Sequence, residues 1–280
     1  MPAFPVSYHN HTRYCDGQGS VDQVVEAAAA AGLVEVGISS HAPLPFATEW
    51  TMPLDALDSY VNDVRQTQKR YADRIQVLLG AEIDFIPGPA ITAFQQERIL
   101  SNGFDYFVVS VHFLGHIDRP RSMDDSRRQF DEILAEDYAG DLRAMVADYY
   151  GRVARSVTIP RGAIIGHLDR IKRWNHGRRY FTGEEPWYRG AVNQALDTIE
   201  ASGAIVELNT SGWDKGLEEP FPSEWILACC GERGIPITIS SDSHSPADLT
   251  RHFDRARDLL SRHRIEPVYL RPQSPNENRP

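Results

Sequence analysis

The chain has 280 residues, of which 41% are hydrophobic and 24% charged, and its formal net charge is -10. This composition is typical of a soluble globular protein with one large α/β domain or two small ones. The acidic balance argues against a nucleic-acid-binding surface, which is usually basic. No apolar run approaches the roughly 20 residues that span a bilayer, so we expect no membrane partner.

Strand-like and helical segments alternate along the chain. The predicted strands cover residues 4–9, 34–39, 75–83, 106–111, 163–165, 204–208 and 236–239, with a weaker one at 267–270. Apolar spacing predicts helices over 21–31, 54–71, 90–100, 136–157, 187–201, 223–232 and 247–262. The polar connection 115–130, rich in Arg and Asp, is expected to be a loop over the functional site.

The ends of the chain and its cysteines carry little functional information. No basic region followed by an apolar core opens the chain, so we expect no signal peptide. Three cysteines are too few for a disulfide framework, and we expect a cytoplasmic protein in which Cys15, Cys229 and Cys230 are structural. We expect one domain over residues 1–270, followed by a flexible tail over 271–280.

The alternation of strands and helices implies parallel strands joined by right-handed crossovers. Two α/β architectures fit, a closed or nearly closed barrel and an open doubly wound sheet. A doubly wound sheet gathers its ligands at a switch point between a few strands. Here residues that carry chemistry follow nearly every strand, which favours a single-domain barrel.

Seven short hydrophobic runs end on a residue that can hold a metal ion. Because the carboxyl ends of barrel strands meet at one face, these residues would converge there. The arrangement predicts a metal-dependent hydrolase. The candidate residues at the strand ends are His9, His11, His41, Glu82, His112, His167, Asn209, Asp242 and His244.

Each candidate also has a simpler explanation. His9 and His11 alternate along a strand and can face the same side, but they can also be surface histidines. Glu82 lies in an apolar strand, where a carboxylate is costly to bury unless it binds a metal or pairs with a cation such as Arg65 or Arg98. Asp84 is expected to point the other way, as a solvated or capping residue.

The motif Asp242-Ser243-His244 repeats the alternate spacing of the first motif. The first and last strands of a closed barrel are neighbours, so the two motifs would meet. Asp242 and Ser243 can alternatively cap the helix that starts near Pro246. Asp16 is either a ligand or a turn residue before Gly17. The remaining histidines are expected at the surface, and of these His116 is close enough to the site to contact a substrate. They are His116, His176, His252 and His263.

With these motifs the chain resembles the PHP superfamily of metal-dependent phosphoesterases, and most of all its histidinol-phosphate phosphatase branch. The resemblance runs from His9 to His244. It implies a distorted (β/α)7 TIM-like barrel with three divalent metal ions, which can be zinc, iron or manganese. The motifs that carry it are His9-Asn10-His11-Thr12, Gly80-Ala81-Glu82-Ile83-Asp84, Ser110-Val111-His112-Phe113, Gly166-His167-Leu168-Asp169, Glu207-Leu208-Asn209-Thr210-Ser211-Gly212 and Ser241-Asp242-Ser243-His244.

The resemblance also implies a distribution of ligands. One metal would be held by His9, His11, Glu82 and Asp242. Glu82 would bridge to a second metal, which also takes His112 and His167, and the third would be held by Asp16, His41 and His244. We expect Glu82, Asp242 and His244 to act in catalysis.

Metals about 3.5–4 Å apart can share a bridging hydroxide that attacks the phosphorus of a phosphate monoester. Basic residues would neutralise the phosphate, and each candidate can equally be a solvated charge. The candidates are Arg13, Arg170, Lys172, Arg173 and Lys215.

The implied reaction converts L-histidinol phosphate and water to L-histidinol and phosphate, in histidine biosynthesis. Histidinol phosphatases commonly carry an arginine where this chain has Asp214, which we expect to meet the substrate ammonium group. A related barrel acting on another small phosphate ester or a nucleotide is the alternative. A noncatalytic module should have lost ligands, and a metal amidohydrolase should show a lysine at a strand end.

Overall fold

The computed structural model describes residues 4–116, 118–159 and 163–270. Within them, seven parallel strands form the wall of a barrel, in the order β1-β2-β3-β4-β7-β8-β9. The expected tail over 271–280 lies outside the described residues. The strands are β1 (Val6–Ser7), β2 (Glu35–Ile38), β3 (Gln76–Asp84), β4 (Tyr106–Ser110), β7 (Ile164–Ile165), β8 (Ile205–Asn209) and β9 (Ile237–Ser240), with β5 (Phe113–Leu114) and β6 (Arg121–Ser122) forming a separate antiparallel hairpin.

The barrel closes between its first and last strands. The backbone N–H of His11 donates to the Ser243 carbonyl at 2.8 Å, and the N–H of Ser243 donates to the His9 carbonyl at 3.1 Å. These bonds continue the parallel pairing through a bridge between Asn10 and Ser243. The predicted barrel is therefore confirmed, and the open doubly wound sheet is excluded.

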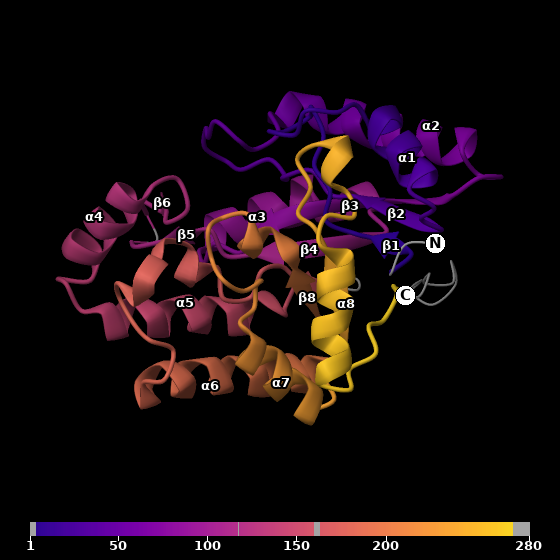
Figure 1. Cartoon of the computed structure of the whole chain (residues 1–280). Helices are drawn as coiled ribbons and strands as arrows, with labels where there is room; N and C mark the ends of the chain where they lie inside the picture. Colours follow the sequence, from indigo (N-terminus) through magenta and orange to yellow (C-terminus); the bar gives the residue numbers. More distant parts are fainter. Residues whose placement is uncertain (1–3, 117, 160–162, 271–280) are drawn as a thin grey trace.

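Helices surround this sheet, with α1 and α2 on one side and α5 and α6 on the opposite side (Figure 1). Short 3₁₀ segments lie at Leu54–Ala56, Leu100–Asn102, Arg170–Trp174, His176–Arg178, Thr210–Trp213 and Pro246–Asp248. No helix in the described ranges has the length and apolar character needed to cross a bilayer. The α-helices are α1 (Val21–Ala30), α2 (Leu57–Arg70), α3 (Pro89–Arg98), α4 (Arg127–Asp137), α5 (Leu142–Ser156), α6 (Pro186–Ser202), α7 (Glu224–Glu232) and α8 (Phe253–Arg262).

Several expected elements differ from the structure. The helix expected over 247–262 is a 3₁₀ segment at Pro246–Asp248 followed by α8, and the loop expected over 115–130 contains β6 and the start of α4. The single helix predicted over 136–157 is wrong: α4 ends at Asp137, and α5 begins at Leu142. Positive φ angles of 51° at Ala139 and 80° at Gly140 break the helix, and Asp141 caps the new one. The weak strand expected at 267–270 is also absent, although the N–H of Val268 donates to the Ile237 carbonyl at 2.7 Å.

The interior of the barrel is filled by side chains from facing strands. Tyr106 of β4 lies across two glycines, and a Cβ atom would come within 2.1 Å of its side chain at Gly37 and within 2.3 Å at Gly80. The Tyr106 hydroxyl donates to the carbonyl of Tyr8, the residue that follows β1. The two glycines thus make room for an aromatic ring that links opposite parts of the wall.

Candidate metal centre

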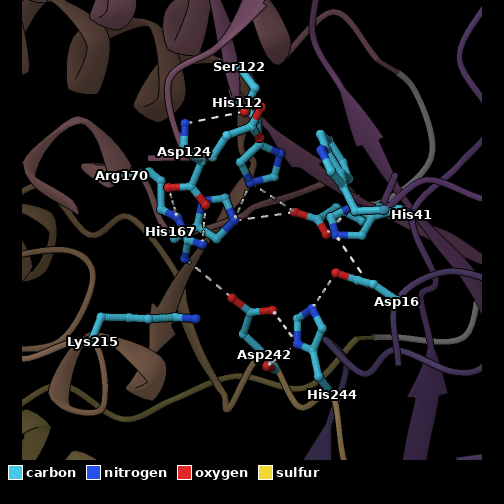
Figure 2. Close-up of a pocket in the computed structure, with 13 residues that line it drawn as sticks. Asp16, His41, His112, Ser122, Asp124, His167, Arg170, Lys215, Asp242 and His244 are labelled. Carbon is cyan, nitrogen blue, oxygen red and sulfur yellow. Dashed lines mark hydrogen bonds and ion pairs between the residues drawn. The ribbon is translucent and has the colours of Figure 1, made fainter. Parts of the chain in front are cut away.

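Histidine and carboxylate side chains from six strand ends converge at one end of the barrel. His9 and His11 follow β1, and His41 follows β2. Glu82 comes from β3 itself. His112 follows β4, His167 follows β7, and Asp242 and His244 follow β9. This convergence follows from the parallel strands, which all end at the same face. Figure 2 shows His41, His112, His167, Asp242 and His244 around one pocket.

Glu82 lies at the centre of the cluster and is 1% exposed. Its Oε2 atom is 3.1 Å from His9 Nε2, 3.4 Å from His11 Nε2 and 2.9 Å from His41 Nδ1. Its Oε1 atom is 3.2 Å from His167 Nε2 and 3.8 Å from His112 Nε2. One carboxylate therefore contacts imidazoles from five different positions in the chain.

A second group lies beside it, around Asp16. The Oδ2 atom of Asp16 is 3.3 Å from His244 Nε2, and its Oδ1 atom is 3.9 Å from His41 Nε2. Ligand atoms of Asp16, His41, His244 and also His11 lie within 4.8 Å of one another. The resemblance implied this set without His11, which the structure places between the two groups.

Several atoms in the cluster are buried without a hydrogen-bond partner in the described part of the chain. They are His9 Nε2, His11 Nε2, His41 Nδ1, His167 Nδ1 and Glu82 Oε2. A buried polar atom without a partner destabilises the folded protein. A group of five such atoms therefore indicates that another partner, such as a metal ion, binds here. Imidazole nitrogens and carboxylate oxygens form the donor set preferred by zinc, iron and manganese, and the residues therefore fit a metal centre.

Two further carboxylates hold the histidines in place from outside. Glu207 Oε1 is 2.8 Å from His9 Nδ1, and Glu207 Oε2 accepts from the backbone N–H of His167 at 2.9 Å. Asp84 Oδ1 is 2.9 Å from His112 Nδ1. Histidines that bind metals commonly donate their other ring N–H in this way.

The expectation that Asp84 points away from Glu82 and is solvated was wrong. Asp84 is 3% exposed and contacts His112, because residues two apart on a strand point to the same face. The alternation that identified His9 and His11 also applied here.

The close packing of charges shifts the pKa values of the cluster. Burial opposes ionisation of Glu82, but His41 and His9 outweigh it and hold the pKa of this carboxyl well below its usual range. Burial would lower the pKa of His112, but Asp84 raises it to about 9. Burial, together with His244 and His41, lowers the pKa of His11 to about 3. A neutral imidazole, as at His11, is the form that binds a metal.

Two of the converging residues have unusual backbones. The φ angle is 21° at His167 and 53° at Asp242, in a region that side-chain-bearing residues rarely adopt. Such strain persists where the surrounding structure fixes the residue, and it concentrates at functional sites. The turns after β7 and β9 therefore aim these side chains into the cluster.

A pocket of about 280 Å³ opens onto the cluster. Arg170 and Lys215 supply positive charge to its wall. Arg170 donates two hydrogen bonds to Asp124, at 3.0 and 2.6 Å, and lies 3.5 Å from Asp242. Burial and the neighbouring Arg170 guanidinium lower the pKa of Lys215. Figure 2 shows the Lys215 side chain extending toward the cluster.

Four residues expected to bind substrate do not line this pocket. The Cζ atom of Arg173 lies 4.2 Å from the centre of the Trp174 ring. Arg13 is exposed, and its guanidinium donates to Gln23 at 3.4 Å. Lys172 is buried between Asp169 and Glu219, with its Nζ atom 2.9 and 3.0 Å from their carboxylates. These expectations rested on distance along the chain from a motif, which does not fix the direction of a side chain.

Asp214 is the fourth residue that was expected to bind substrate but does not line the pocket. Its carboxylate pairs with Arg251 at 2.8 Å and with His252 at 3.0 Å. Arg251 and His252 come from the segment before α8, so no local pattern in the sequence indicates this pairing.

Sequence reasoning did not single out four residues of the pocket wall. Trp50 packs its ring 4.5 Å from that of His41. The other three, Ser122, Asp124 and Asp125, come from the connection 115–130. The sequence predicts that this connection covers the site, but no local pattern indicates which of its polar residues face inward.

Comparison with known proteins gives an independent view. The model of the PHP domain family matches residues 7–211. A protein of Deinococcus radiodurans named "Probable histidinol-phosphatase" is 32% identical over 88% of this chain and 88% of its own length. The histidinol-phosphatase of Bacillus subtilis is 26% identical over 86% of this chain and 94% of its own.

Among solved structures, the chain is similar to the histidinol phosphate phosphatase of Lactococcus lactis, which was crystallised with zinc, L-histidinol and phosphate. The TM-score is 0.72 at 20% identity, over 94% of this chain and 95% of the other. At this level of identity the likeness establishes a shared fold.

Proposed function

Because the chain belongs to the PHP domain family, we propose that it is a metal-dependent phosphatase that hydrolyses L-histidinol phosphate to L-histidinol and phosphate. The observation that carries the proposal is the convergence of nine histidine, aspartate and glutamate side chains beside a pocket with two cations. The reaction would serve histidine biosynthesis, as the names of the relatives indicate.

The metal ligands we propose are the residues of the cluster. His9, His11, Glu82 and Asp242 would hold one ion, and Glu82 would be shared with a second. His112 and His167 would complete the second position, and Asp16, His41 and His244 a third. The donor set suits zinc, iron(II) or manganese. Once bound, such ions supply an activated water and neutralise charge on the phosphate.

The other residues of the pocket would bind and orient the ester. Lys215 makes no ion pair within the described residues, so its ammonium group is available to the phosphate. Arg170 is fixed by Asp124, which leaves its Nη1 side facing Asp242 and the cluster. The surrounding carboxylates repel the negatively charged phosphate. The two cations, Arg170 and Lys215, would offset this repulsion and hold the phosphate beside the ligands.

The test is phosphate release from L-histidinol phosphate by the purified, metal-loaded protein, with and without a chelator, alongside metal analysis. We expect release that stops on chelation and returns on adding back zinc, manganese or iron(II). A panel of other phosphate monoesters, including nucleotides, identifies the preferred substrate. Failure to turn over histidinol phosphate, with good turnover of another ester, would favour the alternative substrate class.

A further inference from the structure

Five carboxylates line the pocket, and four of them have partners. Glu82 contacts the histidines, Asp16 is 3.3 Å from His244, and Asp242 is 3.3 Å from His11. Asp124 holds Arg170 through two hydrogen bonds. The fifth, Asp125, is exposed and has no ion pair or side-chain hydrogen bond within the described residues.

The position of Asp125 is fixed by its neighbours. The carboxylate of Asp124 accepts a hydrogen bond from Arg170. The backbone N–H of Asp124 donates to Ser122 Oγ at 3.3 Å. On the other side, Ser126 caps α4 by accepting from the N–H of Gln129 at 3.1 Å. Asp125 therefore stands between two fixed points, on the outer wall of the pocket.

The inference rests on the proposed function and concerns the organic half of the substrate. If the phosphate lies on the cluster with Arg170 and Lys215, the rest of the molecule must point toward the opening. In L-histidinol phosphate, the carbon next to the esterified one bears an ammonium group. Arg170 and Lys215 repel that cation, and the other carboxylates of the wall are engaged.

We propose that Asp125 pairs with the substrate ammonium group and so selects phosphate esters of amino alcohols. It takes the role that the sequence had suggested for Asp214, whose carboxylate is occupied by Arg251 and His252. A carboxylate next to the pocket mouth attracts a cationic substrate without needing to contact the reacting phosphorus.

The experiment compares Asp125→Asn with the unmodified protein on two substrates. One is L-histidinol phosphate, and the other is 3-(imidazol-4-yl)propyl phosphate, which lacks only the amine. We expect kcat/KM for histidinol phosphate to fall roughly fivefold, through KM, because an exposed ion pair is worth up to about 1 kcal/mol. The value for the amine-free ester should stay unchanged.

Asp118→Asn is the matched control, because Asp118 is an exposed aspartate of the same connection and does not line the pocket. It should leave both substrates unaffected. Asp125 also precedes α4, so the melting temperature of each variant is recorded to detect a purely helix-stabilising role.

An equal loss on both substrates, or an unchanged KM for histidinol phosphate, would overturn the assignment of Asp125. The proposed function is judged separately, on the unmodified protein. If that protein does not hydrolyse histidinol phosphate, the function fails whatever the variants do.

Discussion

Glu82 shows how a chain can keep a charge inside its core. It is 1% exposed, and an isolated carboxylate there would be strongly destabilising. Five imidazoles surround it. Burial raises its pKa, but His41, His9 and His167 outweigh burial and hold the pKa well below the usual range. Glu207 and Asp84 fix the rings from the other side, through His9 and His112. Two carboxylates outside the proposed ligand set, Glu207 and Asp84, therefore help to organise the cluster.

Glu207 is the residue whose replacement tests this organisation. It accepts from His9 Nδ1, from the His167 N–H and from the Asn209 amide at 3.0 Å. In Glu207→Gln an amide NH₂ group, which donates, would replace one carboxylate oxygen that now accepts from these groups. The support of His9 and His167 would weaken, so we expect a roughly 10- to 100-fold loss of metal affinity or activity. Metal content after dialysis and phosphate release measure it.

Glu232→Gln, at an exposed position of α7, provides the control and should bind metal normally. If Glu207→Gln retained full metal content and normal turnover, the supporting role of Glu207 would be wrong.

At the scale of elements, six of the seven barrel strands contribute both to the core and to the site. The interior of the barrel is packed by residues such as Tyr106, while the residue after the strand faces the pocket. Strand β4 illustrates this, because Tyr106 fills the barrel and His112, just past the strand end, joins the cluster. A change in the packing of a strand is therefore felt at the site.

Gly80→Ala tests the packing of the barrel interior. Its Cβ would lie 2.3 Å from the Tyr106 ring, so we expect the free energy of unfolding to fall by about 1–3 kcal/mol. Gly151→Ala is the control. Apart from the neighbouring residues and backbone of α5, no described atom lies within 4 Å of a Cβ at this position, and the helix should gain up to about 1 kcal/mol. Chemical denaturation measures both. Equal stability of the two variants would show that Tyr106 moves aside without cost.

At the scale of the whole molecule, the site lies where the barrel closes. The motif after β1 and the motif after β9 are joined by backbone hydrogen bonds between His9, His11 and Ser243. The proposed ligands come from the ends of six of the seven barrel strands. Bound metal ions would therefore link most strands of the barrel to one another. Stability and function should therefore depend on the same ions.

Metal removal tests that connection. Ions at about 100 times their dissociation constant stabilise a folded protein by about 2.7 kcal/mol, so we expect chelation to lower the melting temperature by roughly 5–10 °C. Differential scanning fluorimetry with metals added back would follow the recovery. Glu82→Gln should lose most of its activity. When metal is added back to this variant, its melting temperature should rise less than that of the unmodified protein. Identical melting temperatures with and without metal would argue against ligands shared among the strands.

The sequence by itself determined the barrel and the set of strand-end residues that converge, because both follow from periodic local patterns. The alternation of strand-like and helical segments specifies parallel strands, and parallel strands bring their carboxyl ends to one face. Only the tertiary structure decided which charges face the pocket. Asp214 and Lys172 are engaged by distant partners, whereas Asp124 and Asp125 reach the wall from a long connection. The direction of a loop side chain depends on contacts far away in the chain, which no local pattern records.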